Sequence, residues 1–204
     1  MLDVMDCEDA IKATLHMHPE NDAESVFLTG GSHGGFFTSH LICRTDHGVL
    51  YRAASIRNPV WNLAVSYYTS DIPDWAVIEA GGEELTDKEK LLCLYRHSPA
   101  AHVTDAKVPT AIFLGEDDRR CPNEQGLSLH RALKALGVPS KVWVYSEGHP
   151  FNKSLHKGDS LVNTALWFYK FYKLRSTGIP AQVFIQVLFS HLEKVTICLI
   201  SSFG

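Results

Sequence analysis

The sequence lacks any CxxC pair, and its few cysteines are widely scattered. Their number is odd, which does not suit a complete disulfide framework, and their spacing does not suit a structural zinc site. We therefore expect reduced thiols and a cytoplasmic protein. The five residues are Cys7, Cys43, Cys93, Cys121 and Cys198.

The sequence also lacks an excess of basic residues and a long apolar run. Its net charge of −4 gives no basic surface for nucleic acid or for an anionic membrane. No uninterrupted apolar stretch approaches the roughly 20 residues that span a bilayer. The first ten residues, MLDVMDCEDA, are acidic and have no apolar core, so we expect no signal peptide. No internal repeat or low-complexity tract is present.

What remains is the composition of one ordinary globular domain, with 45% hydrophobic and 21% charged residues over 204 positions. Short apolar runs predict buried strands, and apolar residues at helical spacing lie between them. The region 62–96 has mixed character and predicts helices and loops over the sheet edge. This alternation predicts an α/β protein with a mostly parallel sheet. The predicted strands are Val26–Thr29, Tyr51–Ile56, Thr110–Gly115 and Lys141–Tyr145. The predicted helices include Asp6–His18, one after the glycines that carries Phe37 and Leu41 on one face, one closed by Gly137 and one opening at Asp159.

A glycine-rich stretch, Gly30–Gly34, joins the first predicted strand to the helix after it. It reads Gly-Gly-Ser-His-Gly and fits G-x-S-x-G, the pattern of a nucleophile elbow when it lies between a strand and a helix. Such a turn exposes the Ser32 hydroxyl at the carboxyl end of the sheet. It also points the His33 backbone N–H toward a developing oxyanion. The alternatives are a glycine-rich turn with a buried serine, or a phosphate loop, although a phosphate loop favours lysine where Phe36 stands.

A serine nucleophile needs a base, and the base needs an orienting acid. In this fold the acid and then the histidine follow later strands. The strand Thr110–Gly115 runs into an acidic loop that holds Asp117 and Asp118, and the next strand runs into His149. We expect Asp118 to orient His149 and His149 to accept the proton of Ser32. Asp117 is the rival for the acid.

Several strings in the sequence resemble the catalytic domain of the acylaminoacyl-peptidases, which are in the prolyl oligopeptidase family of serine peptidases. The resemblance covers roughly residues 6–172 and implies an α/β-hydrolase fold with a doubly wound sheet. It places the family nucleophile on Ser32 and the family histidine on His149. In the family, the acid stands two residues before an arginine, so the resemblance selects Asp118. The resemblance also implies that Arg120 contacts a carbonyl group of the substrate backbone. The strings are GGSHGGF (30–36), RNPV (57–60), SDIPDWAVIEAG (70–81), LGEDDRRCP (114–122) and GH (148–149).

The resemblance implies a peptidase that releases an N-acylated amino acid from the amino end of a short peptide. It implies an acyl-enzyme on Ser32, no metal or organic cofactor, and a homo-oligomer. Asp74 and Trp75 match family positions and lie either near the acyl pocket or in the core. Two other readings remain open, a carboxylesterase of the wider α/β-hydrolase group and a catalytically inactive remnant.

The sequence also departs from the family pattern. Family members are several times longer, carry a β-propeller, and have an HGGP-type segment that supplies a second oxyanion donor. We therefore expect a partial catalytic domain over residues 1–174 with a truncated sheet, an exposed sheet edge and little or no activity. We expect a divergent tail over residues 175–204. The tail is either an added amphipathic helix or read-through sequence.

Overall fold

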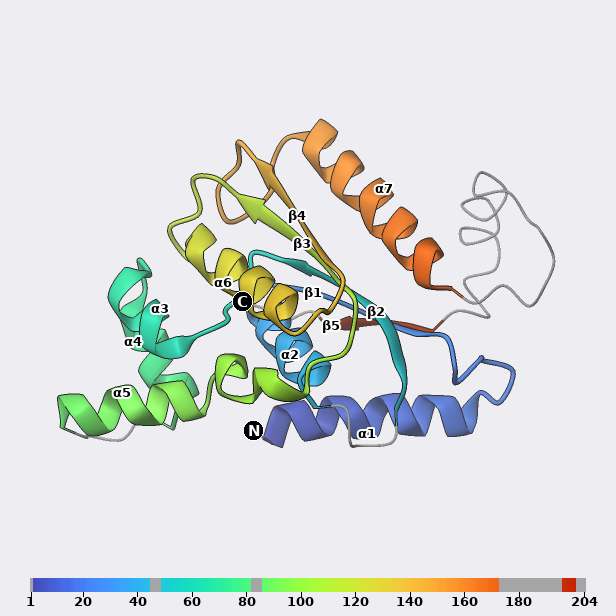
Figure 1. Cartoon of the computed structure of the whole chain (residues 1–204), viewed down its shortest axis with the longest axis horizontal. Helices are drawn as coiled ribbons and strands as arrows, with labels where there is room; N and C mark the ends of the chain where they lie inside the picture. Colours follow the sequence, from blue (N-terminus) through green and yellow to red (C-terminus); the bar gives the residue numbers. More distant parts are fainter. Residues whose placement is uncertain (1, 45–48, 82–85, 173–195, 201–204) are drawn as a thin grey trace.

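A computed structural model gives the arrangement of the chain (Figure 1). It describes residues 2–44, 49–81, 86–172 and 196–200. A parallel sheet lies at the centre, with helices on both of its faces. This architecture confirms the predicted α/β fold class.

The described strands form one sheet in the order β4-β3-β2-β1-β5, and every neighbouring pair is parallel. Because parallel strands all point the same way, their carboxyl ends meet at one edge of the sheet. Four of the strands fall where the sequence predicts them, with ends that differ by two residues at most. The strands are β1 (Val26–Gly31), β2 (Tyr51–Arg57), β3 (Thr110–Gly115), β4 (Ser140–Tyr145) and β5 (Thr196–Ile200).

One face of the sheet is covered by α2 and α6, with α1 packed against α2, and the other face is covered by α7 (Figure 1). On the first face, Leu28 and Ile56 pack with residues of the three helices. On the second face, Phe27 and Phe113 pack with Phe168 of α7. The inner strands are therefore buried on both sides, which explains why they appear in the sequence as continuous apolar runs.

The helices account for most of the remaining described chain. Two predicted helix starts were wrong. The first helix begins at Leu2 rather than Asp6, and the last begins at Ser154 rather than Asp159. Neither Asp6 nor Asp159 is a cap, and Asp159 instead accepts a hydrogen bond from Tyr145 Oη at 2.6 Å. The helices are α1 (Leu2–Met17), α2 (His33–Ile42), α3 (Leu63–Thr69), α4 (Pro73–Glu79), α5 (Asp87–Arg96), the 3-10 helix Pro99–Asp105, α6 (Asn123–Ala135) and α7 (Ser154–Phe171).

The described part of the predicted tail is a strand, not a helix. Residues 196–200 form β5, which pairs in parallel with β1 from Val26 to Gly30. The edge of β1 that faces away from β2 is therefore hydrogen-bonded to β5. The other residues of the predicted tail, 175–195 and 201–204, lie outside the described residues. Among the described helices, none combines the length and the apolar character needed to cross a lipid bilayer.

Candidate active site

Ser32 lies at the turn between β1 and α2, at the carboxyl edge of the sheet. Its φ of 56° is in the left-handed region that a non-glycine residue adopts only under strain. Gly30 makes the turn possible, because a Cβ atom there would lie 2.3 Å from the carbonyl oxygen of Gly34. The predicted strained strand-to-helix turn is present, and it holds the serine between two tightly packed elements.

The hydroxyl of Ser32 is not used to cap the helix that follows it. Ser32 is the N-cap residue of α2, yet its side chain makes no capping hydrogen bond. His33 is the first residue of α2, where a backbone N–H has no acceptor within the helix. The hydroxyl is thus available to a partner outside the helix. The N–H of His33 lies at the positive end of the helix, where it is suited to donate to an anion.

The structure brings together the three side chains that the sequence singles out. His149 Nε2 lies 2.8 Å from Ser32 Oγ, and His149 Nδ1 lies 2.8 Å from Asp118 Oδ2. A carboxylate only accepts hydrogen bonds, so Nδ1 carries the proton and Nε2 accepts from the serine hydroxyl. The result is a continuous hydrogen-bonded line from hydroxyl to carboxylate.

The surroundings of Asp118 distinguish it from Asp117. The side chain of Asp118 is fully buried beside His149, and its other oxygen, Oδ1, accepts from the N–H of Arg120 at 2.8 Å and of Cys121 at 2.9 Å. These bonds fix the carboxylate in the turn after β3. Asp117 is exposed, and its backbone N–H donates to the carbonyl of Glu147. The geometry therefore favours Asp118 as the partner of the histidine.

The loop that carries His149 is held against the end of β3. A Cβ atom on Gly115 would lie 2.3 Å from the carbonyl oxygen of Gly148, so the two loops approach at backbone distance. Glu147 is buried, and its carboxylate accepts from the N–H of Lys153 at 2.9 Å and pairs with His156 at 2.9 Å. These contacts tie both ends of the loop to the scaffold, which limits the positions that His149 can take.

Arg120 lies beside this line and forms a two-pronged ion pair with Asp71. The distances are 2.6 Å from Nε to Oδ1 and 3.3 Å from Nη2 to Oδ2. The pairing lowers the pKa of Asp71 and raises that of Arg120. Ser70 Oγ also donates to the carbonyl of Arg120 at 2.8 Å. The segment before α4 thus orients a partly exposed guanidinium two residues along the chain from Asp118.

The side chain of His33 connects the turn to α4. Its Nε2 lies 3.1 Å from Glu79 Oε2, and its ring lies 4.4 Å from the ring of Phe37 and 5.2 Å from that of Trp75. Trp75 therefore packs at the turn between β1 and α2, whereas Asp74 is exposed in the first turn of α4.

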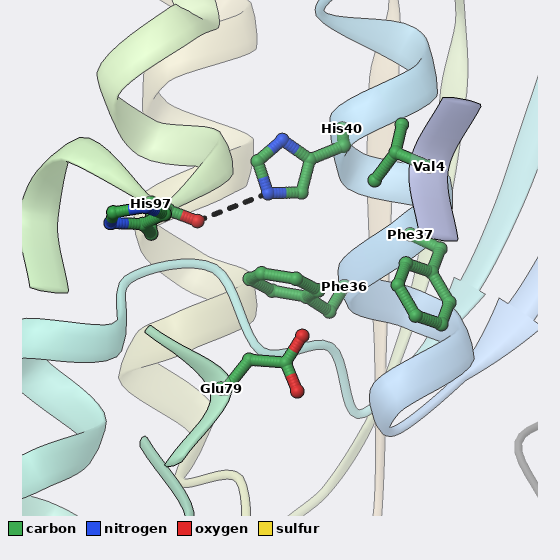
Figure 2. A pocket seen from close by; sticks show the side chains of 6 residues that line it. All are labelled: Val4, Phe36, Phe37, His40, Glu79 and His97. Carbon is green, nitrogen blue, oxygen red and sulfur yellow. Dashed lines mark hydrogen bonds between the residues drawn. The ribbon is translucent and has the colours of Figure 1, made fainter. Parts of the chain in front are cut away.

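Next to this cluster is a small pocket, shown in Figure 2, in which the Glu79 carboxylate lies beside the ring of Phe36. The pocket is lined by Val4, Phe36, Phe37, His40, Glu79 and His97.

Two residues near the site were not singled out by sequence reasoning. Cys121 is buried, and its sulfur lies within 4.8 Å of the ligand atoms of Asp118 and His149. Burial raises the pKa of the Cys121 thiol, so it stays protonated and is a poor nucleophile. Asn58 is buried and contacts the carbonyl of His149. In the sequence, Asn58 belongs to the RNPV string (57–60) and directly follows a predicted strand, but neither signal assigned it a role.

Chemically, the arrangement suits acyl transfer, with an activated hydroxyl, a proton acceptor and a backbone donor meeting at one edge of a parallel sheet. The doubly wound sheet and its G-x-S-x-G turn define the class of α/β-hydrolases. Comparison with known proteins then places the chain more narrowly. A model of the prolyl oligopeptidase family matches residues 2–174, and the chain belongs to this family of serine peptidases.

The similar proteins of known name are acylamino-acid-releasing enzymes and acylaminoacyl peptidases, and each is longer than this chain. The acylamino-acid-releasing enzyme of Arabidopsis thaliana is 38% identical over 178 residues, which cover 84% of this chain and 23% of the relative. The enzyme of that name from Homo sapiens is 38% identical over 170 residues, which cover 81% of this chain and 23% of the relative. Among solved structures, an acylaminoacyl peptidase of Pyrococcus horikoshii superimposes with a TM-score of 0.75 at 23% identity, covering 90% of this chain and 30% of that one. The chain thus spans about a quarter of the length of these curated relatives.

Proposed function

We propose that the chain carries the catalytic machinery of a serine peptidase that releases N-acylated amino acids from the amino end of short peptides. The observation that supports this proposal most strongly is the ring of His149, which lies 2.8 Å from both Ser32 Oγ and Asp118 Oδ2. The relatives named acylamino-acid-releasing enzyme support the substrate class.

In the proposed reaction, Ser32 Oγ attacks the carbonyl carbon of the first peptide bond and His149 Nε2 accepts the hydroxyl proton. The N–H of His33 donates to the oxyanion of the tetrahedral intermediate. The carbon–nitrogen bond then breaks, and the imidazolium of His149 gives its proton to the leaving amine. Asp118 stabilises the imidazolium throughout.

The acyl-enzyme is resolved by the reverse sequence of proton transfers. Water attacks the ester carbonyl while His149 accepts its proton, and Ser32 leaves with a proton from the same imidazole. The products are the N-acylated amino acid and the free hydroxyl. We assign this reaction no metal or organic cofactor, because each proton transfer is made by a side chain of the triad.

The rate of the 204-residue chain by itself is expected to be low. Within the described residues, the one donor that we assign to the oxyanion is the N–H of His33. Loss of one of two such donors typically slows the chemical step by on the order of 10²–10³. We therefore propose slow turnover with intact reactivity of Ser32 toward strong electrophiles.

The test compares acetyl-alanyl nitroanilide, unblocked alanyl nitroanilide and a simple acyl ester as substrates of the purified chain. We expect the acetylated anilide to be hydrolysed slowly but faster than the unblocked one, and we expect this hydrolysis to be lost in Ser32→Ala. Hydrolysis of the ester alone favours the carboxylesterase alternative. Absence of all hydrolysis, together with an unreactive Ser32 in folded protein, favours the inactive remnant.

For Arg120 we propose a contact with a backbone carbonyl of the substrate. Asp71 engages Nε and Nη2, and a guanidinium has five N–H donors, so donors remain for a second acceptor. Arg120→Ala is expected to raise KM for the acetylated anilide by about 10-fold, the usual size for a hydrogen bond to a charged group. The neighbouring Arg119 is exposed, and Arg119→Ala serves as the matched control, with KM unchanged. Equal effects in both variants contradict the role of Arg120.

A further inference from the structure

Asn58, directly after β2, shares an unusual backbone conformation with Ser32. Its φ is 44°, and these two are the non-glycine residues with positive φ in the described part of the chain. Asparagine tolerates this region better than most residues, but the conformation still costs energy. The side chain is also buried, with 1% of its surface exposed. A buried polar residue in a strained conformation is stable only if specific hydrogen bonds offset the cost.

The hydrogen bonds of Asn58 connect three strand ends. Its backbone N–H donates to the carbonyl of Phe113 at 2.9 Å, and its Oδ1 accepts from the N–H of Gly115 at 2.8 Å. Both partners belong to β3, which leads into the turn of Asp118. The Nδ2 group donates to the carbonyl of His149 at 2.8 Å. One side chain therefore fixes the backbone of the proposed base relative to the strand that precedes the acid.

The same segment also holds the serine. The residue before Asn58 is Arg57, and its carbonyl accepts the backbone N–H of Ser32 at 3.0 Å. Since β2 lies between β1 and β3 in the sheet, its end contacts the turn of Ser32, the end of β3 and the loop of His149. The positive φ of Asn58 turns the chain at that place, so that its amide faces the loops rather than the strand ladder.

We propose that Asn58 is a positioning residue that holds His149 in line between Ser32 and Asp118. This inference rests on the proposed function, because the position of His149 affects the reaction only if His149 is the base that activates Ser32. It assigns Asn58 no contact with substrate. A shift of about 1 Å in a catalytic group lowers rates by on the order of 10²-fold. Removal of the Nδ2 bond therefore reduces the reactivity of Ser32 beyond any effect on folding.

The test uses two variants of Asn58 and one control. Asn58→Gly removes the side chain and accepts the positive φ without strain. Asn58→Asp keeps the shape and the acceptor for Gly115, but places a carboxylate oxygen against the carbonyl of His149 at pH 8. The matched control is Asn62→Ala, which removes two side-chain hydrogen bonds, to the N–H groups of Ala64 and Val65, in the neighbouring cap of α3.

Three quantities are measured for each folded variant. They are the second-order rate of Ser32 labelling by a fluorophosphonate, the melting temperature, and the downfield proton resonance of His149 Nδ1–H. We expect labelling of the Asn58 variants to slow by on the order of 10²-fold, with the resonance shifted or lost. The Asn62 variant melts earlier but labels at the wild-type rate and keeps the resonance.

The proposal is overturned if a folded Asn58 variant keeps both the wild-type labelling rate and the resonance. It is also overturned if Asn62→Ala slows labelling as much as the Asn58 variants do, because the effect is then one of general stability. If Asn58→Gly does not fold, Asn58→Asp decides. An unlabelled wild-type protein contradicts the proposed function instead. In that case, the resonance still tests whether Asn58 positions His149.

Discussion

At the scale of single residues, the site depends on which atoms of Asp118 and His149 carry protons. Asp118 Oδ1 accepts two backbone N–H groups, and Oδ2 faces His149 Nδ1. This division of the carboxylate forces the neutral imidazole to keep its proton on Nδ1. Nε2 is then left as an acceptor for the hydroxyl of Ser32. The tautomer is thus determined by the carboxylate of Asp118, which two backbone N–H groups in the turn after β3 hold in place.

Asp118→Asn tests this dependence. The new amide oxygen keeps both backbone bonds, while its NH₂ group faces Nδ1 and favours the tautomer that cannot accept a proton at Nε2. We expect the rate of Ser32 labelling to fall by about 10⁴, the effect of the equivalent change in serine peptidases, with an unchanged circular dichroism spectrum. Asp117→Asn is the matched control and is expected to label normally. Similar losses in the two variants argue against Asp118 as the orienting acid.

A second residue-scale feature is the buried His40 of α2. Its Nε2 donates to the carbonyl of His97 at 3.2 Å, as Figure 2 shows. Burial, aided by the nearby charge of His102, lowers the pKa of His40 to about 3. An unfolded histidine titrates near 6.5. Between these two values the unfolded chain binds more protons at this site, so folding loses stability as the pH falls from about 6.5 toward 3.

His40→Gln is expected to remove this pH dependence while keeping a donor to His97. One and a half pH units below 6.5, the histidine costs the folded state about 2 kcal/mol. The free energy of unfolding by urea is measured for both proteins at pH 7 and pH 5. From pH 7 to pH 5, the free energy of unfolding of the glutamine variant is expected to rise by about 2 kcal/mol relative to that of the wild-type protein. A difference that is the same at both pH values contradicts a buried, neutral His40.

At the scale of elements, the junction of β1 and α2 determines whether Ser32 is presented at all. Gly30→Ala places a methyl group 2.3 Å from the carbonyl of Gly34, so the strand and helix must separate. We expect a loss of about 1–3 kcal/mol in stability and slower labelling of Ser32. Gly158, exposed within α7 and open around its Cα atom, provides the opposite case.

Gly158→Ala is expected to stabilise the protein by about 0.5–1 kcal/mol, because alanine favours the helix and meets no neighbour. Melting temperatures of the two variants check both signs. If Gly30→Ala is as stable as the wild-type protein and labels normally, the turn does not need glycine at that position.

The sequence predicts some elements well and others poorly, for physical reasons. Buried strands such as Thr110–Gly115 stand out because both of their faces are apolar, and the turn at Ser32 stands out because its glycines are required by close packing. The start of α7 was missed because Lys153 precedes it without a capping side chain. Strand β5 was missed because its pairing with β1 joins segments far apart in the chain.

The same distinction applies to the site. The closeness of Ser32, Asp118 and His149 could be predicted from the sequence because each follows a strand in a fixed order. Asn58 could not, because its role depends on a positive φ and on three partners that only the folded sheet brings together. The pairing of Arg120 with Asp71 was likewise hidden, since it joins loops that are 49 residues apart.

At the scale of the whole molecule, three side chains from three loops form one hydrogen-bonded line at one edge of the sheet, and we propose that this line makes Ser32 reactive. The loops are held together by backbone contacts between strand ends, by the ion pair of Arg120, and by Asn58. We therefore expect the reactivity of Ser32 to depend on the folded sheet and not on the G-x-S-x-G turn alone.

Mass spectrometry of the folded chain after reaction with a fluorophosphonate tests this claim most directly. We predict a single covalent adduct that maps to Ser32, that is lost in Ser32→Ala, and that forms far more slowly in His149→Ala. A folded chain that forms no adduct, or an adduct that maps to another residue, contradicts it.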